Sequence, residues 1–121
     1  MTKERPHLPG LVNNQTTAIE EFQNITIRPI IKMQHHLLIA LFRSYLIKRK
    51  INFSILSEDE KKAKIKITLQ KDLQFKSVIL GIVIGHFSID ELYTYDLNNS
   101  DYNKRILNIT IKRLQDSLIE L

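Results

Sequence analysis

Apolar residues recur along much of the chain every three or four positions, which is the spacing that places them on one face of an α-helix. The longest such stripe runs through Ile30, Met33, Leu37, Leu41 and Tyr45. It predicts a core helix. Pro29 fits the first turn of that helix, because its missing N–H would have no partner there. The helix therefore starts near Pro29, or it continues with a kink from a shorter helix before it.

Short polar segments separate the apolar stripes, and several begin with a side chain that can cap a helix. In a capping box, a Ser or Thr accepts a hydrogen bond from a backbone N–H, and a glutamate three residues later reaches back. Three capping boxes and two simple caps predict helix starts at Thr17, Ser57, Asp72, Ser88 and Ser100. Residues 1–16 contain Pro, Gly and Asn without periodicity, and they predict a flexible N-terminal arm.

Two segments fit either a helix or a strand. In the first, four apolar residues alternate with polar ones, as in a strand: Ala63, Ile65, Ile67 and Leu69. We favour a helix there, because a capping box and an acidic turn precede the alternation and no partner strand is evident. The second segment, residues 73–84, is apolar nearly all round and predicts a buried central helix. Residues 78–84 alone would also fit a buried strand.

Glycine is scarce, and this changes the choice of fold. The chain of 121 residues has three Gly and three Pro, too few turn residues for a β-sandwich or barrel. Gly81, inside the apolar segment, suggests a close helix crossing, and Gly85 is expected to end that helix in the left-handed conformation. With 43% hydrophobic and 26% charged residues, the chain is globular. We predict an all-α, single-domain bundle of about five helices over residues 17–121.

The chain has no Cys, so it offers no disulfide, thiolate metal site or Cys nucleophile, and it fits a reducing compartment. No apolar leader is visible at its start, and the longest apolar run, residues 78–84, is too short to span a membrane. We expect a cytoplasmic protein without membrane contact and without a cofactor. The formal net charge is +5, but a Lys- and Ile-rich composition weakens it as evidence for a polyanion partner.

Histidines and carboxylates give one weak candidate for chemistry. His86 precedes a predicted helix start, with Asp90 and Glu91 one turn later, and together they could bind a metal or act in acid–base catalysis. The alternative is that both acids serve only the first turn of the helix. His35 and His36 are neighbours on a helix and point about 100° apart, so we do not expect them to share a metal ion.

The last predicted helix has a basic face, with Lys104, Arg105, Asn108 and Lys112 as its nucleic-acid-binding candidates. Arg113 lies beside the same stripe. A short helix and a tight turn come before it, so the pair could form a helix-turn-helix that reads a DNA groove. The alternative is that this Lys-rich face only faces water.

The same helix also carries a heptad seam: Leu107, Ile111, Leu114 and Leu118. Such a seam can bury itself against a second copy of the chain, and a twofold helical dimer is the commonest outcome. The alternative is that the seam meets the other apolar stripes within one monomer.

Several short strings resemble a family of short bacterial proteins whose function is not established, some of which carry the name glyoxalase. They are EFQN (21–24), RPI (28–30), LL (37–38), IGHFS (84–88) with Glu91, and NKRI (103–106). The resemblance spans nearly the whole chain after residue 20, and it brings no understood catalytic motif. The name implies a metal-dependent enzyme. Glyoxalases themselves resemble one another in paired βαβββ modules, and this chain lacks the β-rich alternation of such modules.

Three functions are thus compatible with the sequence. The first is a non-enzymatic interaction protein that forms a homodimer through the heptad seam. The second is nucleic-acid binding through the last helix. The third is a metal-dependent enzyme that uses His86.

Overall fold

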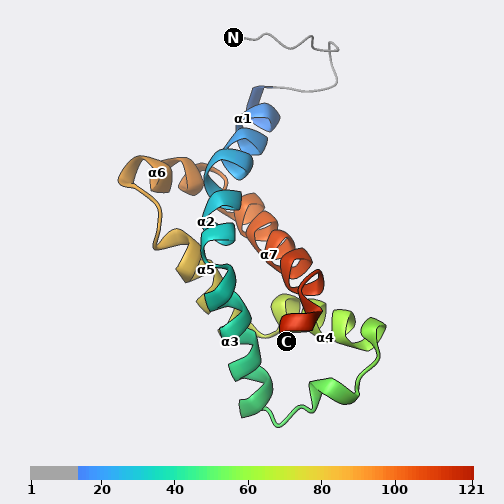
Figure 1. Cartoon of the computed structure of the whole chain (residues 1–121). Coiled ribbons are helices and arrows are strands. Elements are labelled where there is room, and N and C mark those ends of the chain that lie inside the picture. Colours follow the sequence, from blue (N-terminus) through green and yellow to red (C-terminus); the bar gives the residue numbers. More distant parts are fainter. Residues whose placement is uncertain (1–13) are drawn as a thin grey trace.

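The computed structural model of the chain describes residues 14–121. These residues form helices joined by short turns, with no strand among them (Figure 1). In chain order the elements are α1 (Asn14–Phe22), the π-helical turn η1 (Gln23–Ile27), α2 (Arg28–Met33), α3 (His35–Lys48), the 3₁₀ turn η2 (Phe53–Ile55), α4 (Glu58–Lys71), α5 (Leu73–Ile84), α6 (Ile89–Leu97), α7 (Asn99–Gln115) and the 3₁₀ turn η3 (Leu118–Glu120). The all-α prediction is confirmed, and both segments that also fitted a strand are helices.

The N-terminal helices follow one another in a nearly continuous line from the top of Figure 1. The backbone keeps right-handed helical angles through Arg28, whose N–H donates to the carbonyl of Gln23, five residues back. Proline in an α-helix clashes with the carbonyl four residues before it. The wider π turn directly before Pro29 relieves this clash. The chain therefore continues from the first helix through the π turn, as the alternative predicted, and α2 begins at Arg28 with Pro29 in its first turn.

The first helix begins before its predicted cap. Helix α1 starts at Asn14, so Thr17 lies inside the helix and does not open it. The residues just before Thr17 are polar, and they take helical geometry as readily as those after it. The predicted arm, residues 1–16, lies outside the described residues except for its last three, which are helical.

Two capping boxes and one simple cap form as predicted. The hydroxyls of Ser57 and Ser88 each accept a backbone N–H at 3.1 Å, and the glutamates reach back at 2.8 Å. The carboxylate of Asp72 accepts the N–H of Phe75 at 3.0 Å and caps α5. The prediction for Ser100 is wrong, because α7 starts one residue earlier and Ser100 lies in its first turn.

Asp72 also ties the end of α3 to the start of α5. Its carboxylate pairs with the Arg49 guanidinium at 2.8 Å. The hydrogen bond from the Phe75 N–H lowers the pKa of Asp72, desolvation opposes this, and Arg49 lowers the pKa further. The carboxylate form is thus the one that the fold stabilises.

Helix α4 buries one side only. Ile65 and Leu69 are fully buried, whereas Ile67 between them is 55% exposed. Residues two apart share a face in a strand, while residues four apart share one in a helix. The alternation of apolar and polar residues therefore does not describe the burial, and the four-residue spacing does.

Helix α5 also buries one face, although it is apolar nearly all round. Its buried side chains are Phe75, Ile79 and Val83. Leu73 is 74% exposed on the other face. Gly81 is exposed, and a Cβ placed there would meet nothing within 4 Å, so it marks no close helix crossing. Gly85 keeps right-handed helical angles (φ −62°, ψ −15°), so the predicted left-handed stop is wrong.

Helix α7 holds the bundle together, because it packs against η1, α2, α4, α5 and α6. The heptad seam faces these helices. Ile111 and Leu114 are buried in the core of the same chain, and Leu107 and Leu118 pack against that core. Within one chain these four side chains therefore pack as the intramolecular alternative predicts, while Leu107 and Leu118 stay partly exposed.

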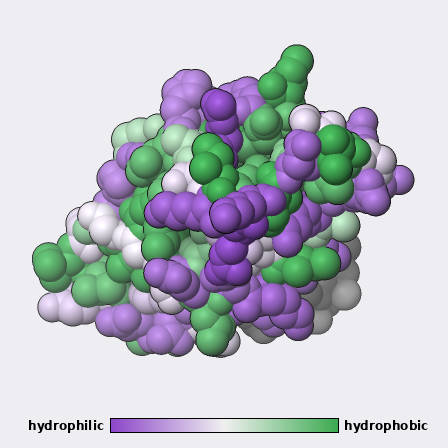
Figure 2. All heavy atoms as spheres, turned by 90° about the horizontal axis from the view of Figure 1, so that it is seen from below, coloured by the Kyte–Doolittle hydropathy of each residue, from purple (hydrophilic) through white to green (hydrophobic). Residues whose placement is uncertain are grey.

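Several large apolar side chains stay exposed, among them Ile47, Ile55 and Leu97. On the face shown in Figure 2, the lower end of the molecule in Figure 1, apolar and polar side chains are interspersed. Self-association therefore stays a prediction to which this face adds no distinct apolar patch. Across residues 14–121, no helix combines the length and the apolar content needed to cross a membrane.

Candidate nucleic-acid interface

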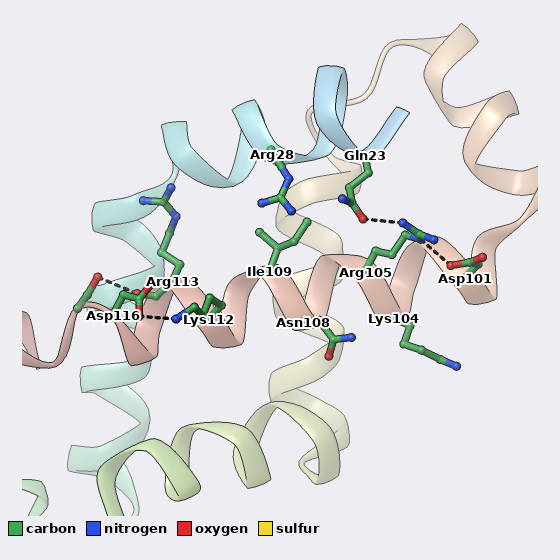
Figure 3. A pocket seen from close by; sticks show the side chains of 11 residues that line it. Gln23, Arg28, Asp101, Lys104, Arg105, Asn108, Ile109, Lys112, Arg113 and Asp116 are labelled. Carbon is green, nitrogen blue, oxygen red and sulfur yellow. Dashed lines mark hydrogen bonds and ion pairs between the residues drawn. The ribbon is translucent and has the colours of Figure 1, made fainter. Parts of the chain in front are cut away.

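An open groove of about 720 Å³ runs along α7 and reaches η1 and α2 (Figure 3). Its lining consists of Gln23, Arg28, Asp101, Lys104, Arg105, Asn108, Ile109, Lys112, Arg113, Asp116 and Ser117. All four residues that the sequence suggested for nucleic-acid binding are among them. The groove therefore gathers the basic face of α7 around a single hollow.

Helical spacing explains the part of the groove that comes from α7. Lys104, Asn108 and Lys112 follow one another at intervals of four, so they lie along one side of the helix. The opposite wall comes from Gln23 and Arg28, the two residues joined by the π-turn hydrogen bond. Sequence reasoning missed both, because only the tertiary packing of η1 and α2 on α7 brings them to the groove.

The groove has a surplus of positive charge. Five of its lining side chains are Lys or Arg and two are Asp, so three positive charges remain after pairing. Arg105 pairs with Asp101 at 2.8 Å and Lys112 pairs with Asp116 at 3.0 Å. Both pairs join residues four apart; Lys112–Asp116 is exposed and worth about 0.3–0.5 kcal/mol, whereas Arg105–Asp101 is part-buried and Arg105 also donates to Gln23 at 2.8 Å. An arriving polyanion can therefore replace Asp116 beside Lys112 at little cost.

Two of the cations are only lightly held. Lys104 is exposed, and within the described part of the chain it makes no ion pair. Arg28 is also exposed, and its side chain donates to the amide oxygen of Asn24 at 3.0 Å. Figure 3 shows Arg28 and Lys104 on opposite sides of the α7 ribbon. These two side chains can turn towards a ligand without breaking an ion pair.

One buried tyrosine lies directly next to the groove residues. Tyr102 is 1% exposed, and burial raises the pKa of its hydroxyl, with Asp101 raising it further and Arg105 lowering it. Tyr102 therefore stays neutral at ordinary pH. The charge of the groove comes from its Lys, Arg and Asp side chains alone.

Arg113 connects the groove to a histidine on α3. Its guanidinium lies 3.1 Å from Nδ1 of His35, whose Nε2 lies 3.1 Å from both carboxylate oxygens of Glu120. Arginine can only donate, so Nδ1 accepts and Nε2 carries the proton towards Glu120. This chain of contacts fixes the neutral tautomer of His35 and ties η3 to α3.

The helix-turn-helix prediction does not hold. Helices α6 and α7 are separated by the single residue Asn98, whereas a helix-turn-helix needs a turn of three or four residues. In addition, α7 carries η1 and α2 beside its basic face. A recognition helix must project into the major groove, and α7 is flanked instead.

The weak metal candidate at the start of α6 is not assembled. Nδ1 of His86 donates to the carbonyl of Ile82 at 2.8 Å, and its Nε2 lies 3.0 Å from the amide nitrogen of Gln34. Glu91 is occupied by the capping box of α6. His86, Asp90 and Glu91 do not bring three ligand atoms together among the described residues.

Comparison with protein-family models, with curated proteins and with solved structures finds no match for this chain. The resemblance to short bacterial proteins stays an expectation from the sequence. The function is therefore argued from the groove itself.

Proposed function

We propose that this chain binds nucleic acid through its phosphate groups, in the groove between α7 and the η1–α2 segment. The observation that carries the proposal is the convergence of Lys104, Arg105, Asn108 and Lys112 on one hollow of about 720 Å³. A second wall adds Arg28 from a distant part of the chain. Scattered lysines that only keep a protein soluble have no reason to gather in this way.

The composition of the groove favours contacts to phosphates over the reading of bases. Base stacking on single strands requires aromatic side chains, and the lining of this groove has none. Reading a duplex requires a projecting helix, and α7 is flanked by α2. Lys and Arg side chains around an open hollow instead suit the nucleic-acid backbone, and binding through them is independent of sequence.

The salt dependence of such binding follows from the number of phosphates contacted. If Lys104, Lys112 and Arg28 each neutralise one phosphate of a duplex, log K falls with log[salt] with a slope of about −2.7. Affinity then drops about 40-fold between 50 and 200 mM salt. Each contact is worth about 15-fold at 50 mM salt on the same basis.

The test is fluorescence anisotropy with a labelled 20-base-pair duplex of mixed sequence, over a range of salt concentrations. The variant Lys104→Ala with Lys112→Ala should bind about 200-fold more weakly at 50 mM salt, and its slope should fall to about −0.9. The control variant is Lys66→Ala with Lys71→Ala. It removes the same charge from exposed positions on α4 that do not line the groove.

Equal losses in the two double variants would mean that only net charge matters, and the groove would then not be the site. Binding that does not respond to salt would refute the phosphate contacts. A second duplex of unrelated sequence should bind within a factor of about three, because the proposed contacts read no bases.

A further inference from the structure

A second group of side chains lies away from the open part of the groove, where η3 meets the start of α3. His35, His36 and Glu120 each offer one ligand atom, and these three atoms lie within 4.8 Å of one another. We infer that this group binds a divalent transition-metal ion of the zinc class. Two imidazoles and one carboxylate form a ligand set that zinc uses in proteins, with a fourth position left open for water.

The distances between the ligand atoms already approach those of a zinc site. Nε2 of His35 lies 3.1 Å from both oxygens of Glu120. In a tetrahedral site with bonds of about 2.0–2.1 Å, neighbouring ligand atoms are about 3.3 Å apart. A metal ion can thus replace the proton between His35 and Glu120 with a movement of a few tenths of an ångström.

His36 supplies the third ligand. Adjacent residues of a helix point about 100° apart, yet the length of the side chains leaves the two imidazole rings with centroids 5.2 Å apart. His36 is exposed, and within residues 14–121 its side chain makes no hydrogen bond or ion pair and lies beside the ring of His35. Rotation about its side-chain bonds therefore needs to break no hydrogen bond.

Arg113 is the group that opposes the metal. Its guanidinium donates to Nδ1 of His35 at 3.1 Å. When a metal takes Nε2, the neutral imidazole must carry its proton on Nδ1, which then faces another N–H. Arg113 must turn away for the metal to bind. The site therefore exchanges two hydrogen bonds, Arg113 to His35 and His35 to Glu120, for three metal–ligand bonds at His35, Glu120 and His36.

The test is calorimetric titration of the full chain with Zn²⁺, in a buffer that does not chelate metal. We expect a site with one ion per chain that the variants His36→Ala and Glu120→Gln weaken by about 100-fold or more, since even the loss of an outer-shell partner costs 10–100-fold. Glu120→Gln keeps an oxygen that can accept from His35, so the contact between η3 and α3 survives while the anionic ligand is lost. Co²⁺ should give the visible absorption of a tetrahedral site in the unchanged chain only.

The matched control is His86→Ala, which removes another exposed histidine that is outside the group. It should bind Zn²⁺ as the unchanged chain does. The absence of Zn²⁺ binding would overturn the inference, as would equal binding in His36→Ala or in Glu120→Gln. Far-UV circular dichroism of each variant separates a lost ligand from a lost fold. The metal site and the nucleic-acid groove are tested with different ligands, so either can fail alone.

Discussion

Two positions of α4 that lie two residues apart give a sharp test of the fold. A helix buries one of the two side chains and exposes the other, whereas a strand places both on the same face. Leu69 is fully buried on the side of α4 that packs against α5 and α7, whereas Ile67 is 55% exposed. In a strand both would lie on one face. Each residue is therefore replaced with Ala in a separate variant. The difference between the two losses of unfolding free energy then distinguishes a helix from a strand.

The expected magnitudes differ several-fold. Leu69→Ala removes a fully buried side chain from a packed core, which costs about 3 kcal/mol. Ile67→Ala removes mostly exposed surface and gains helix propensity, so the free energy of unfolding should change by about 0.5 kcal/mol or less. Urea denaturation followed by far-UV circular dichroism measures both. With a slope of about 2 kcal/mol per molar urea, the midpoint falls by about 1.5 M for Leu69→Ala and by about 0.25 M or less for Ile67→Ala.

Equal losses at the two positions would refute the helical assignment of α4. The slope of the transition must also stay unchanged in both variants, because a changed slope means that the compactness of one state has changed. A protein of this size unfolds with about 5–15 kcal/mol, so the weaker variant remains folded in the absence of urea.

Three further predictions use side chains described above. Ser88→Ala should lower the free energy of unfolding by about 1 kcal/mol through the loss of a cap, while Ser100→Ala, inside the first turn of α7, should change it by about 0.5 kcal/mol or less; urea midpoints compare the two. Because the fold lowers the pKa of Asp72 below its ordinary value of 3.8, its contribution to stability is complete above that value and is lost as the pH falls through the lowered one. Asp72→Asn should therefore lose less stability than the unchanged chain between about pH 5 and pH 2. Arg113→Met removes the donor that competes for Nδ1 of His35, so Zn²⁺ should bind about tenfold more tightly in calorimetry; weaker binding would contradict the competition.

The helix starts show what local sequence can and cannot determine. Ser57 and Ser88 were predictable because the donor and acceptor of a capping box lie within three residues of each other. Thr17 and Ser100 also carry hydroxyls that can cap a helix, but they lie inside α1 and α7. The residues before them are also helical, and the pattern of caps does not predict how far a helix extends before a capping residue. Gly85 fails in the same way, because a glycine permits the left-handed conformation without requiring it.

The candidate site was half visible in the sequence. The basic face of α7 could be predicted, because a spacing of four residues fixes the side of a helix without reference to the rest of the fold. The wall formed by Gln23 and Arg28 could not, because it depends on how η1 and α2 pack on α7. The position of the Arg28 charge at the groove is therefore set by tertiary packing.

The metal candidate shows a different limit of sequence reasoning. Helix geometry predicts that His35 and His36 point about 100° apart, but it does not include the length of the side chains or the approach of Glu120. Glu120 lies 85 positions along the chain from His35. No local pattern links two residues at such a separation, so only the folded chain brings the group into view.

The π turn η1 sets the rotation of α1 about the helix axis relative to α2. Phe22 and Ile27, five residues apart, both lie in the core, a separation that suits a turn wider than an α-helical one. Deleting one residue from this turn would restore the ordinary α-helical repeat and rotate α1 by about 100° relative to α2. Phe22 would then leave the core and Gln23 would leave the groove. The number of residues in η1 is therefore constrained by the packing of α1 and α2, as the identity of a core residue is constrained by its neighbours.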